Sequence, residues 1–333
     1  METNIKKLFK QYSLGEIILP ILPVSGGLMH KMYKAETGSG TFAVKVLNRE
    51  IMKRPDAANN YARAEKLECL LEAEGLPLVP AISFDGKKML ELDGDFFYIF
   101  KWQEGSITDW DAISKEQCFI AGELLGRIHK IDAQNVEAQA PEECNIDFES
   151  YIKAAKEKYP GSKLATLLSE NLSLLQSAQA SLNQARKNLP AMKAITDDDM
   201  DPKNVMWYKG QPHIIDLECL DYGNPLSSCL NLALQWSGTL NQNFKKENLA
   251  AFYEGYFKAY DNGFRSYDEL FGIAYSWLEW LEYNIRRALG QEAASPEEIA
   301  LGQQEVQNTI ERIKYLNQIE KEVCGCLKKL FLF

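Results

Sequence analysis

Short apolar stretches separated by glycine-containing turns dominate the first part of the chain. Between residues 18 and 47, the runs 32–36 and 42–46 are rich in β-branched, aromatic and apolar residues and flank a turn at 37–40. Such runs between turn residues predict antiparallel β-strands. The N-terminal part is therefore expected to form an antiparallel sheet.

One helix is expected to interrupt these strands. Residues 56–74 carry apolar side chains at helical spacing and stop at Gly75. The runs 89–92 and 96–100 follow, joined through Asp93-Gly94, which is a turn sequence typical of a hairpin. This hairpin would complete the sheet, and the pattern changes after residue 103.

Helical periodicity prevails from there to the end of the chain. The helix that ends the chain should begin at Ser295-Pro296-Glu297-Glu298, which has the residues of a capping box with proline at the first helical position. One β-rich island, residues 204–216, is read as a hairpin within the helical part, with a turn at Lys209-Gly210. The predicted helices are 115–131, 148–187 with a break at Pro160-Gly161, 245–261, 267–290 and 296–330.

The length and composition of the chain are those of an ordinary folded protein that is large enough for two lobes. The chain has 333 residues, of which 46% are hydrophobic and 25% charged, which excludes a disulfide-stapled miniprotein and makes disorder or a coiled-coil rod a poor description. A net charge of −10 disfavours binding to nucleic acid through the phosphate backbone and would suit a cationic small substrate. The chain start lacks the blocks of a signal peptide, and no apolar run approaches the roughly 20 residues of a membrane span, so a cytoplasmic protein without a membrane partner is expected.

The cysteines suggest neither disulfides nor a metal site. There are seven, an odd number, and they are scattered apart from Cys324 and Cys326. With three histidines in the chain and none near that pair, reduced thiols are the expected state.

The strongest chemical signal is an acidic run followed by the hairpin. Asp199 and Asn204 form an Asp-x4-Asn motif, and Asp216 and Glu218 follow the second strand of the hairpin. Phosphoryl transfer needs a carboxylate that orients the attacking hydroxyl and oxygen ligands for Mg²⁺ on the nucleotide phosphates. An acidic cluster alone is more often a solvated turn, but the hairpin and the following carboxylates favour this chemistry.

On these residues the sequence resembles the aminoglycoside phosphotransferase and choline kinase family. The resemblance implies an α+β, two-lobed, protein-kinase-like fold, with Asp199 as the catalytic base and Asn204 and Asp216 as magnesium ligands. Where the family has His-Gly before the catalytic aspartate, this chain has Asp197-Asp198, so the histidine that usually braces the loop is missing.

Lys45 supplies a second indication in the N-terminal part. It is a lone lysine in the apolar run 42–46, and buried lysines are rarely unpaired. By resemblance, Lys45 would contact the nucleotide phosphates and be held by a helix glutamate, Glu65, with Glu68 as the alternative. The competing interpretation is a lysine extending from an edge strand to solvent.

Two more segments would bind the nucleotide by resemblance. The backbone amides of Ser25, Gly26 and Gly27 could cover its phosphates, although the same residues could be a plain hairpin turn. The segment from Phe100 through Lys101 to Gln103 stands where the family has its hinge, whose backbone would hydrogen-bond a purine.

The histidines receive no catalytic role. His129 ends a helix pattern that resembles a family motif and is expected to be structural. His30 and His213 have no catalytic context in the sequence.

An acceptor site is expected near the predicted helix 267–290. Glu279, Trp280 and Glu282 combine carboxylates and an aromatic wall, which suits an ammonium ligand, and Asp201 and Asp221 would add negative charge. The alternative is that the aromatic residues are core and that the glutamates are solvated or paired with arginine.

These indications predict an enzyme that transfers the γ-phosphoryl group of ATP or GTP, with Mg²⁺, to a hydroxyl of a small molecule. Residues 1–103 would form the nucleotide-binding lobe and residues 104–333 the catalytic and substrate-binding lobe. An aminoglycoside or similar cationic acceptor is the first expectation. Choline or ethanolamine, homoserine, a sugar and a non-catalytic nucleotide-binding role remain as alternatives. The sequence gives no oligomeric state.

Overall fold

The computed structural model describes residues 1–24, 29–133, 143–293 and 295–331 and divides into two compact units. The first unit combines Met1–Ile107 with Lys203–Cys219, and the second combines Thr108–Pro202 with Leu220–Phe333. The segment 203–219 therefore groups with the N-terminal unit, whereas the sequence analysis placed its hairpin in the helical lobe.

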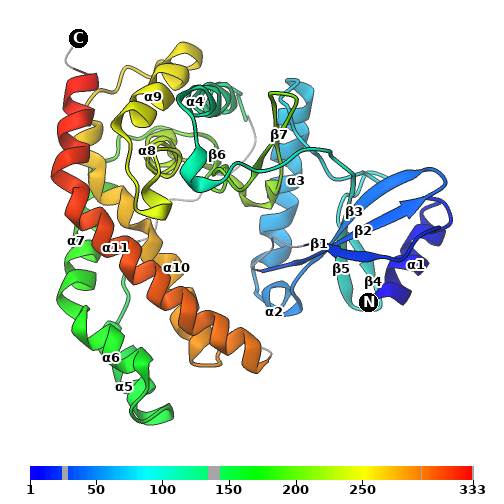
Figure 1. Ribbon diagram of the computed structural model, residues 1–333, viewed down its shortest axis with the longest axis horizontal. Helices are drawn as coiled ribbons and strands as arrows, with labels where there is room; N and C mark the ends of the chain where they lie inside the picture. The colour runs from blue at the N-terminus through cyan, green and yellow to red at the C-terminus, as the bar shows by residue number, and fades with distance from the viewer. Residues whose placement is uncertain (25–28, 134–142, 294, 332–333) are drawn as a thin grey trace. The chain divides into compact units, whose positions relative to one another are not determined.

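A five-stranded antiparallel sheet forms the centre of the first unit, with the strand order β1-β2-β3-β5-β4 (Figure 1). It confirms the strands and the hairpin that the sequence predicted. The core beneath the sheet contains Val44, Phe97 and Ile99, which lie on β3 and β5. The strands are β1 (Leu22–Val24), β2 (Lys31–Thr37), β3 (Gly40–Val46), β4 (Leu90–Leu92) and β5 (Asp95–Lys101).

Three helices accompany this sheet in the first unit. Helix α1 (Glu2–Gln11), which the sequence analysis did not assign, packs on the sheet core through Ile5, Leu8 and Phe9. The other two are α2 (Arg49–Met52) and α3 (Ala57–Ala73); the latter confirms the helix predicted over 56–74.

The hairpin β7 (Val205–Tyr208) and β8 (Gln211–Ile214) joins the first unit by backbone hydrogen bonds. Val79 donates to the Ile214 carbonyl at 2.9 Å, and Ile214 donates to the Pro77 carbonyl at 2.8 Å. Lys209 and Gly210 both have positive φ, as the two central residues of a type I′ turn require. Because both backbone groups of Ile214 are used in this way, the segment that follows the hairpin is fixed to the first unit.

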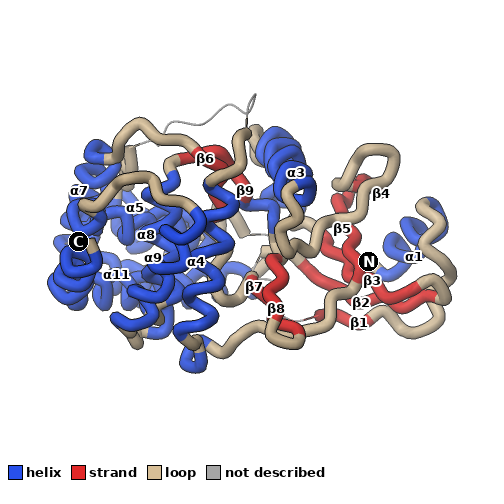
Figure 2. The backbone as a smooth tube through the Cα atoms, turned by 90° about the horizontal axis from the view of Figure 1, so that it is seen from above, coloured by secondary structure: helices blue, strands red, loops and turns tan. Residues whose placement is uncertain are grey.

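The second unit is mainly helical, as Figure 2 shows by colour. A short two-stranded sheet of β6 (Ala194–Asp197) and β9 (Leu220–Gly223) accompanies the helices. Its helices are α4 (Lys115–His129), α5 (Phe148–Lys158), α6 (Lys163–Glu170), α7 (Leu172–Asn188), α8 (Pro225–Trp236), α9 (Lys246–Ala259), α10 (Trp277–Ala288) and α11 (Pro296–Leu330). The 3₁₀ helices of the chain are η1 (Trp110–Ala112), η2 (Leu217–Cys219), η3 (Thr239–Asn241) and η4 (Tyr267–Ser276), of which η2 belongs to the first unit.

One predicted helix differs from the structure, and another has its predicted bounds. The segment 267–290 is not one α-helix, because it begins as η4 and continues as α10. Gly272 in η4 lies so close to α7 that a Cβ atom there would be 2.3 Å from the Ser181 carbonyl oxygen. Helix α11 has the predicted bounds, and the Ser295 hydroxyl accepts a hydrogen bond from the Glu298 amide at 3.3 Å.

The remaining expectations concern membranes and thiols. Within the part of the chain that the structure describes, none of the helices combines the length and the hydropathy of a membrane span. All seven cysteines are free, in agreement with reduced thiols.

Candidate active site

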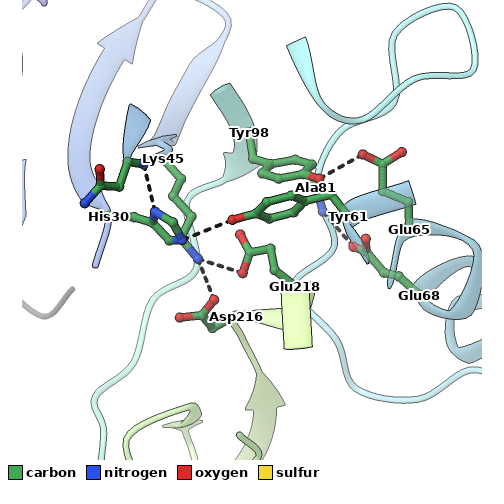
Figure 3. Close-up of polar contacts among 10 residues, drawn as sticks. His30, Lys45, Tyr61, Glu65, Glu68, Ala81, Tyr98, Asp216 and Glu218 are labelled. Carbon is green, nitrogen blue, oxygen red and sulfur yellow. Dashed lines mark hydrogen bonds and ion pairs between the residues drawn. The ribbon is translucent and has the colours of Figure 1, made fainter. Parts of the chain in front are cut away.

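Lys45 lies on β3 in the middle of the sheet, where it faces Met32 of β2 and Tyr98 of β5 in the strand register. Its side chain is 7% exposed, so the predicted burial is confirmed. The ammonium forms ion pairs with Asp216 Oδ1 at 2.5 Å and Glu218 Oε2 at 2.7 Å (Figure 3). Burial alone would lower the pKa of Lys45, but Glu218 and Asp216 raise it above its ordinary value, so the amine stays charged.

The two carboxylates that hold Lys45 belong to one short segment after β8. Asp216 has φ = +62°, a left-handed conformation that is uncommon outside glycine and that turns the chain into η2. Burial opposes ionisation of Asp216, but Lys45 lowers its pKa below the ordinary value. Burial raises the pKa of Glu218, and the nearby Asp216 charge adds to this effect. Lys45 opposes this rise, and its ammonium pairs with both carboxylates.

Asn204 lies next to this segment. Its side chain is buried, with 4% of the residue exposed, and its backbone carbonyl accepts a hydrogen bond from Ile215 at 2.9 Å. This bond joins the start of β7 to the residue immediately before Asp216. Two predicted metal ligands, Asn204 and Asp216, thus belong to neighbouring backbone segments.

The donor set fits Mg²⁺ bound together with a nucleotide. Within the described ranges, no three His, Cys, Asp or Glu side chains gather as a complete metal site. Magnesium needs only one or two carboxylates when phosphate and water oxygens supply its other ligands. Glu218 Oε1 is buried and has no hydrogen-bond partner among the described residues, so it leaves an oxygen that a nearby cation would satisfy. Asp216 and Asn204 are the residues that would hold the ion.

Glu65 and Glu68 do not have the contact that the resemblance implied. Lys45 is paired with Asp216 and Glu218 instead, while Glu65 Oε1 accepts hydrogen bonds from Tyr98 Oη at 2.9 Å and from the Met89 amide at 3.0 Å. Glu65 is held in place by these two donors, the hydroxyl of Tyr98 on β5 and the backbone amide of Met89 just before β4. Glu68 accepts from the Ala81 amide at 2.9 Å and pairs with Lys88 at 3.2 Å.

A small cavity adjoins these glutamates in the first unit. Its volume of about 10 Å³ is close to what one water molecule needs. The walls combine the apolar face of β5 with the acidic face of α3. The lining residues are Ala64, Glu65, Glu68, Ala81, Tyr98, Phe100, Leu217 and Glu218.

Of the predicted hinge residues, Phe100 therefore lines a cavity beside the Lys45 site. Lys101 ends β5 opposite Phe42, and Gln103 uses its side-chain amide on the Glu104 carbonyl at 2.8 Å. The predicted contacts of Ser25, Gly26 and Gly27 lie outside the described residues.

Asp199 belongs to the second unit, in the loop after β6. Its amide donates to Asp197 Oδ1 at 3.3 Å, and the Met200 amide donates to the Asp197 carbonyl at 3.2 Å. Trp236 of α8 donates from Nε1 to the Met200 carbonyl at 2.9 Å. These bonds brace the loop that lacks the family's histidine.

The loop is also strongly acidic. The Asp198 side chain is exposed at the surface, but the protein atoms around it reduce its hydration, and this desolvation raises its pKa. The negative charges of Asp221, Glu279 and Asp199 raise it further. Among the opposing contributions is a hydrogen bond with Ser228. The four carboxylates therefore share one region of the second unit.

The predicted acceptor glutamates are already paired. Glu279 forms an ion pair with Arg186 at 2.7 Å, while Glu282 accepts from Tyr151 Oη at 2.9 Å and lies 3.4 Å from Arg286. The alternative interpretation, in which arginine pairs with these glutamates, thus describes this part of the structure.

Trp280 and Asp201 also have contacts within the protein and do not form an open wall for an acceptor. Trp280 donates from Nε1 to Glu305 at 3.2 Å, and Asp201 is 3% exposed. The guanidinium of Arg312 covers the ring of the neighbouring Trp277 at 3.8 Å from its centroid. Burial lowers the pKa of Arg312 to about 10, while Glu305 and Asp201 oppose the shift, so Asp201 faces a cation of the protein itself.

The sequence analysis missed a contribution from His30, which lies beside Lys45 in Figure 3. The signal that could have found it is the strand register. Once Met32 is paired with Lys45, the residue two positions before Met32 must lie close to the lysine.

Comparisons with known proteins identify the family and the fold of the chain. Residues 20–270 match the model of the phosphotransferase enzyme family. A comparison with curated proteins gives no match.

Several solved structures share the fold. Spectinomycin phosphotransferase in complex with ADP and spectinomycin is 14% identical with a TM-score of 0.69, over 95% of this chain and 98% of that one. Choline kinase from Streptococcus pneumoniae is 18% identical with a TM-score of 0.61, over 94% and 99% of the two chains. Amicoumacin kinase in complex with AMP-PNP and Ca²⁺ is 12% identical with a TM-score of 0.60, over 93% and 96%. These similarities confirm the kinase-like α+β fold.

Proposed function

The chain belongs to the phosphotransferase enzyme family, and we propose that it transfers the γ-phosphoryl group of ATP to a hydroxyl group of a small molecule. The observation that carries this proposal is the buried ion pair of Lys45 with Asp216, next to Asn204. A site that binds a nucleoside triphosphate needs a fixed cation for the phosphates and oxygen ligands for the metal ion, and these residues supply both.

In this proposal the first unit binds the nucleotide. Lys45 donates to phosphate oxygens, and Asp216 and Asn204 hold Mg²⁺, which when bound supplies positive charge beside the phosphates. The neighbours crystallised with ADP, or with AMP-PNP and Ca²⁺, support a nucleotide and a divalent cation as the ligands.

Asp199 is proposed to orient the acceptor hydroxyl and to accept its proton. Its own amide is hydrogen-bonded to Asp197, and Trp236 holds the next residue, so the carboxylate stands on a braced loop. A positioned carboxylate is the usual general base for this transfer.

A cationic acceptor is the first proposal for the substrate. Asp198, Asp199, Asp221 and Glu279 concentrate negative charge in one region, although Arg186 already neutralises part of it. The similar structures of spectinomycin phosphotransferase and choline kinase support compounds of this kind. Homoserine and sugars remain in the set to be tested.

The test is ADP formation from ATP over a panel of aminoglycosides, choline, ethanolamine, homoserine and several sugars, with and without Mg²⁺. We expect Mg²⁺-dependent ADP formation with at least one amine-bearing acceptor. If every acceptor leaves the rate at the background of the protein alone, the proposed reaction is wrong.

The role of Asp199 has its own test on the accepted substrate. We expect Asp199→Asn to lower kcat by about 10²–10⁴-fold, because the amide cannot accept the proton, while nucleotide affinity changes little. Asp261→Asn removes an exposed carboxylate of the same unit and is the matched control. Turnover by Asp199→Asn at the rate of the control would remove Asp199 from the mechanism.

A further inference from the structure

His30 makes two hydrogen bonds that fix its chemical form. The backbone amide of Asn48 donates to Nδ1 at 3.0 Å, and Nε2 lies 3.3 Å from Tyr61 Oη (Figure 3). A backbone amide can only donate, so Nδ1 carries the lone pair. The single proton of the neutral ring must then be on Nε2, from which it points to Tyr61.

The surroundings also keep this ring neutral. Burial lowers the pKa of His30 to about 4, the positive charge of Lys45 acts in the same direction, and the negative charge of Asp216 opposes them. At neutral pH, His30 therefore fills the space beside the Lys45 ammonium without adding a second positive charge there.

The partners of His30 connect it to both sides of Lys45. Asn48 follows β3, the strand that carries Lys45, and its side chain caps α2 by accepting from the Glu50 amide. Tyr61 lies on α3, with its ring 6.1 Å from that of Tyr98, the residue opposite Lys45 in the sheet. The imidazole thus connects the end of the Lys45 strand to helix α3.

We propose that His30 is a positioning residue of the nucleotide site: its Nε2–H tautomer joins the Asn48 amide to Tyr61 and holds the β3 end, with Lys45, in place against α3. The predicted effect of His30 on nucleotide binding and turnover rests on the proposed function. The tautomer of His30 and its two hydrogen bonds do not.

The first experiment determines the tautomer in the ligand-free protein. Long-range ¹H–¹⁵N correlation spectra distinguish an Nε2–H ring, an Nδ1–H ring and an imidazolium. The chain has three histidines, so His30→Asn, His129→Asn and His213→Asn assign each signal by its loss. We expect neutral Nε2–H for His30 at pH 7. An Nδ1–H or protonated ring would overturn the proposal even if no acceptor is ever found.

The second experiment measures binding of AMP-PNP with Mg²⁺ and, on an accepted substrate, kcat and KM. We expect His30→Ala to weaken nucleotide binding and raise KM for ATP about tenfold, as the loss of about one net hydrogen bond implies, with kcat within twofold. His30→Asn should recover part of the affinity, because its side-chain oxygen can accept from the Asn48 amide.

His213→Ala is the matched control, since His213 is a half-buried histidine of the same unit on β8. Nucleotide affinity of His30→Ala equal to that of His213→Ala would contradict the positioning role. If the binding experiment gives the expected loss and the acceptor panel gives no ADP, the role of His30 stands and the proposed reaction fails.

Discussion

At the scale of single residues, the arrangement of charge around Lys45 defines the proposed nucleotide site. One ammonium with 7% of its side chain exposed is shared by Asp216 and Glu218, and the latter retains an unpaired oxygen. Charged groups in such surroundings interact far more strongly than on a surface. Lys45 therefore holds the two carboxylates in place, in addition to the phosphate contact proposed for it.

Lys45→Met should weaken binding of AMP-PNP with Mg²⁺ by about 10- to 100-fold, because hydrogen bonds to charged groups contribute about 1.5–3 kcal/mol. The measurement is calorimetric titration of the intact protein. Lys34→Met removes a lysine of the neighbouring strand that pairs with Glu36, and it should bind the nucleotide as the unaltered protein does. If Lys45→Met binds AMP-PNP within twofold of this control, Lys45 does not contribute to nucleotide binding as proposed.

Sequence reasoning reached part of this site and missed the rest for a definite reason. A lone lysine in an apolar strand predicted burial and an ionic partner, and both are present. The partner was expected to be Glu65, but a sequence does not say which of several carboxylates a lysine reaches. Tyr98 and the Met89 amide hold Glu65 through contacts that no local pattern encodes.

At the scale of elements, glycines set the closest helix contact in the second unit. A Cβ atom at Gly122 of α4 would lie 2.0 Å from the Phe252 carbonyl oxygen, and one at Gly255 of α9 would lie 2.0 Å from the Phe119 carbonyl oxygen. The two helices therefore approach each other backbone to backbone, which only glycine permits at these positions.

Gly122→Ala should force α4 and α9 apart and lower the free energy of unfolding by about 1–3 kcal/mol or more. Urea unfolding followed by circular dichroism measures the change. Gly325→Ala is the control on α11, where a Cβ atom would meet nothing within 4 Å, and it should stabilise the protein by about 0.5–1 kcal/mol. Equal stabilities of the two variants would show that the helices do not need this approach.

Two of the elements that the sequence predicted are marked by turn or stop residues. Helix α3 ends shortly before Gly75, and the hairpin of β7 and β8 has its turn at Lys209-Gly210. Helix α8 was missed because nearly every residue from Pro225 to Trp236 is buried, so no polar face marks a helical period. The segment η4 packs closely against α7, a tertiary contact that the sequence pattern does not reveal.

At the scale of the whole molecule, stability should depend on the pH through a histidine that has no part in the proposed reaction. His129 at the end of α4 is buried and bonded to Tyr256 Oη at 2.8 Å, and burial lowers its pKa to about 3. The unfolded chain binds a proton near pH 6.5, whereas the folded protein does not. The stabilising contribution is therefore full above pH 6.5 and is lost as the pH falls towards 3.

Between pH 6.5 and 5, this one group should lower the free energy of unfolding by about 1.6 kcal/mol, with a slope that approaches about 1.4 kcal/mol per pH unit below pH 5.5. Urea unfolding at both pH values gives the slope, and His129→Asn should show a shallower one, since asparagine does not titrate there. Parallel slopes for the two proteins would contradict a neutral buried imidazole.

The division into two units was only partly visible in the sequence. The change from strands to helices near residue 103 suggested two lobes, but the hairpin at 204–216 stood inside a helical stretch and was assigned to it. Its backbone bonds to Pro77 and Val79 assign it to the other unit, and such long-range pairing leaves no mark in a single sequence.

The broken connectivity of the first unit has a consequence for biosynthesis. As the ribosome releases the chain, Lys45 emerges long before Asp216 and Glu218, because Thr108–Pro202 of the other unit lies between them. Until residue 219 has left the exit tunnel, the nascent sheet carries an ammonium without the counterions that allow it to be buried. The first unit can thus complete its fold only after residue 219 has been translated.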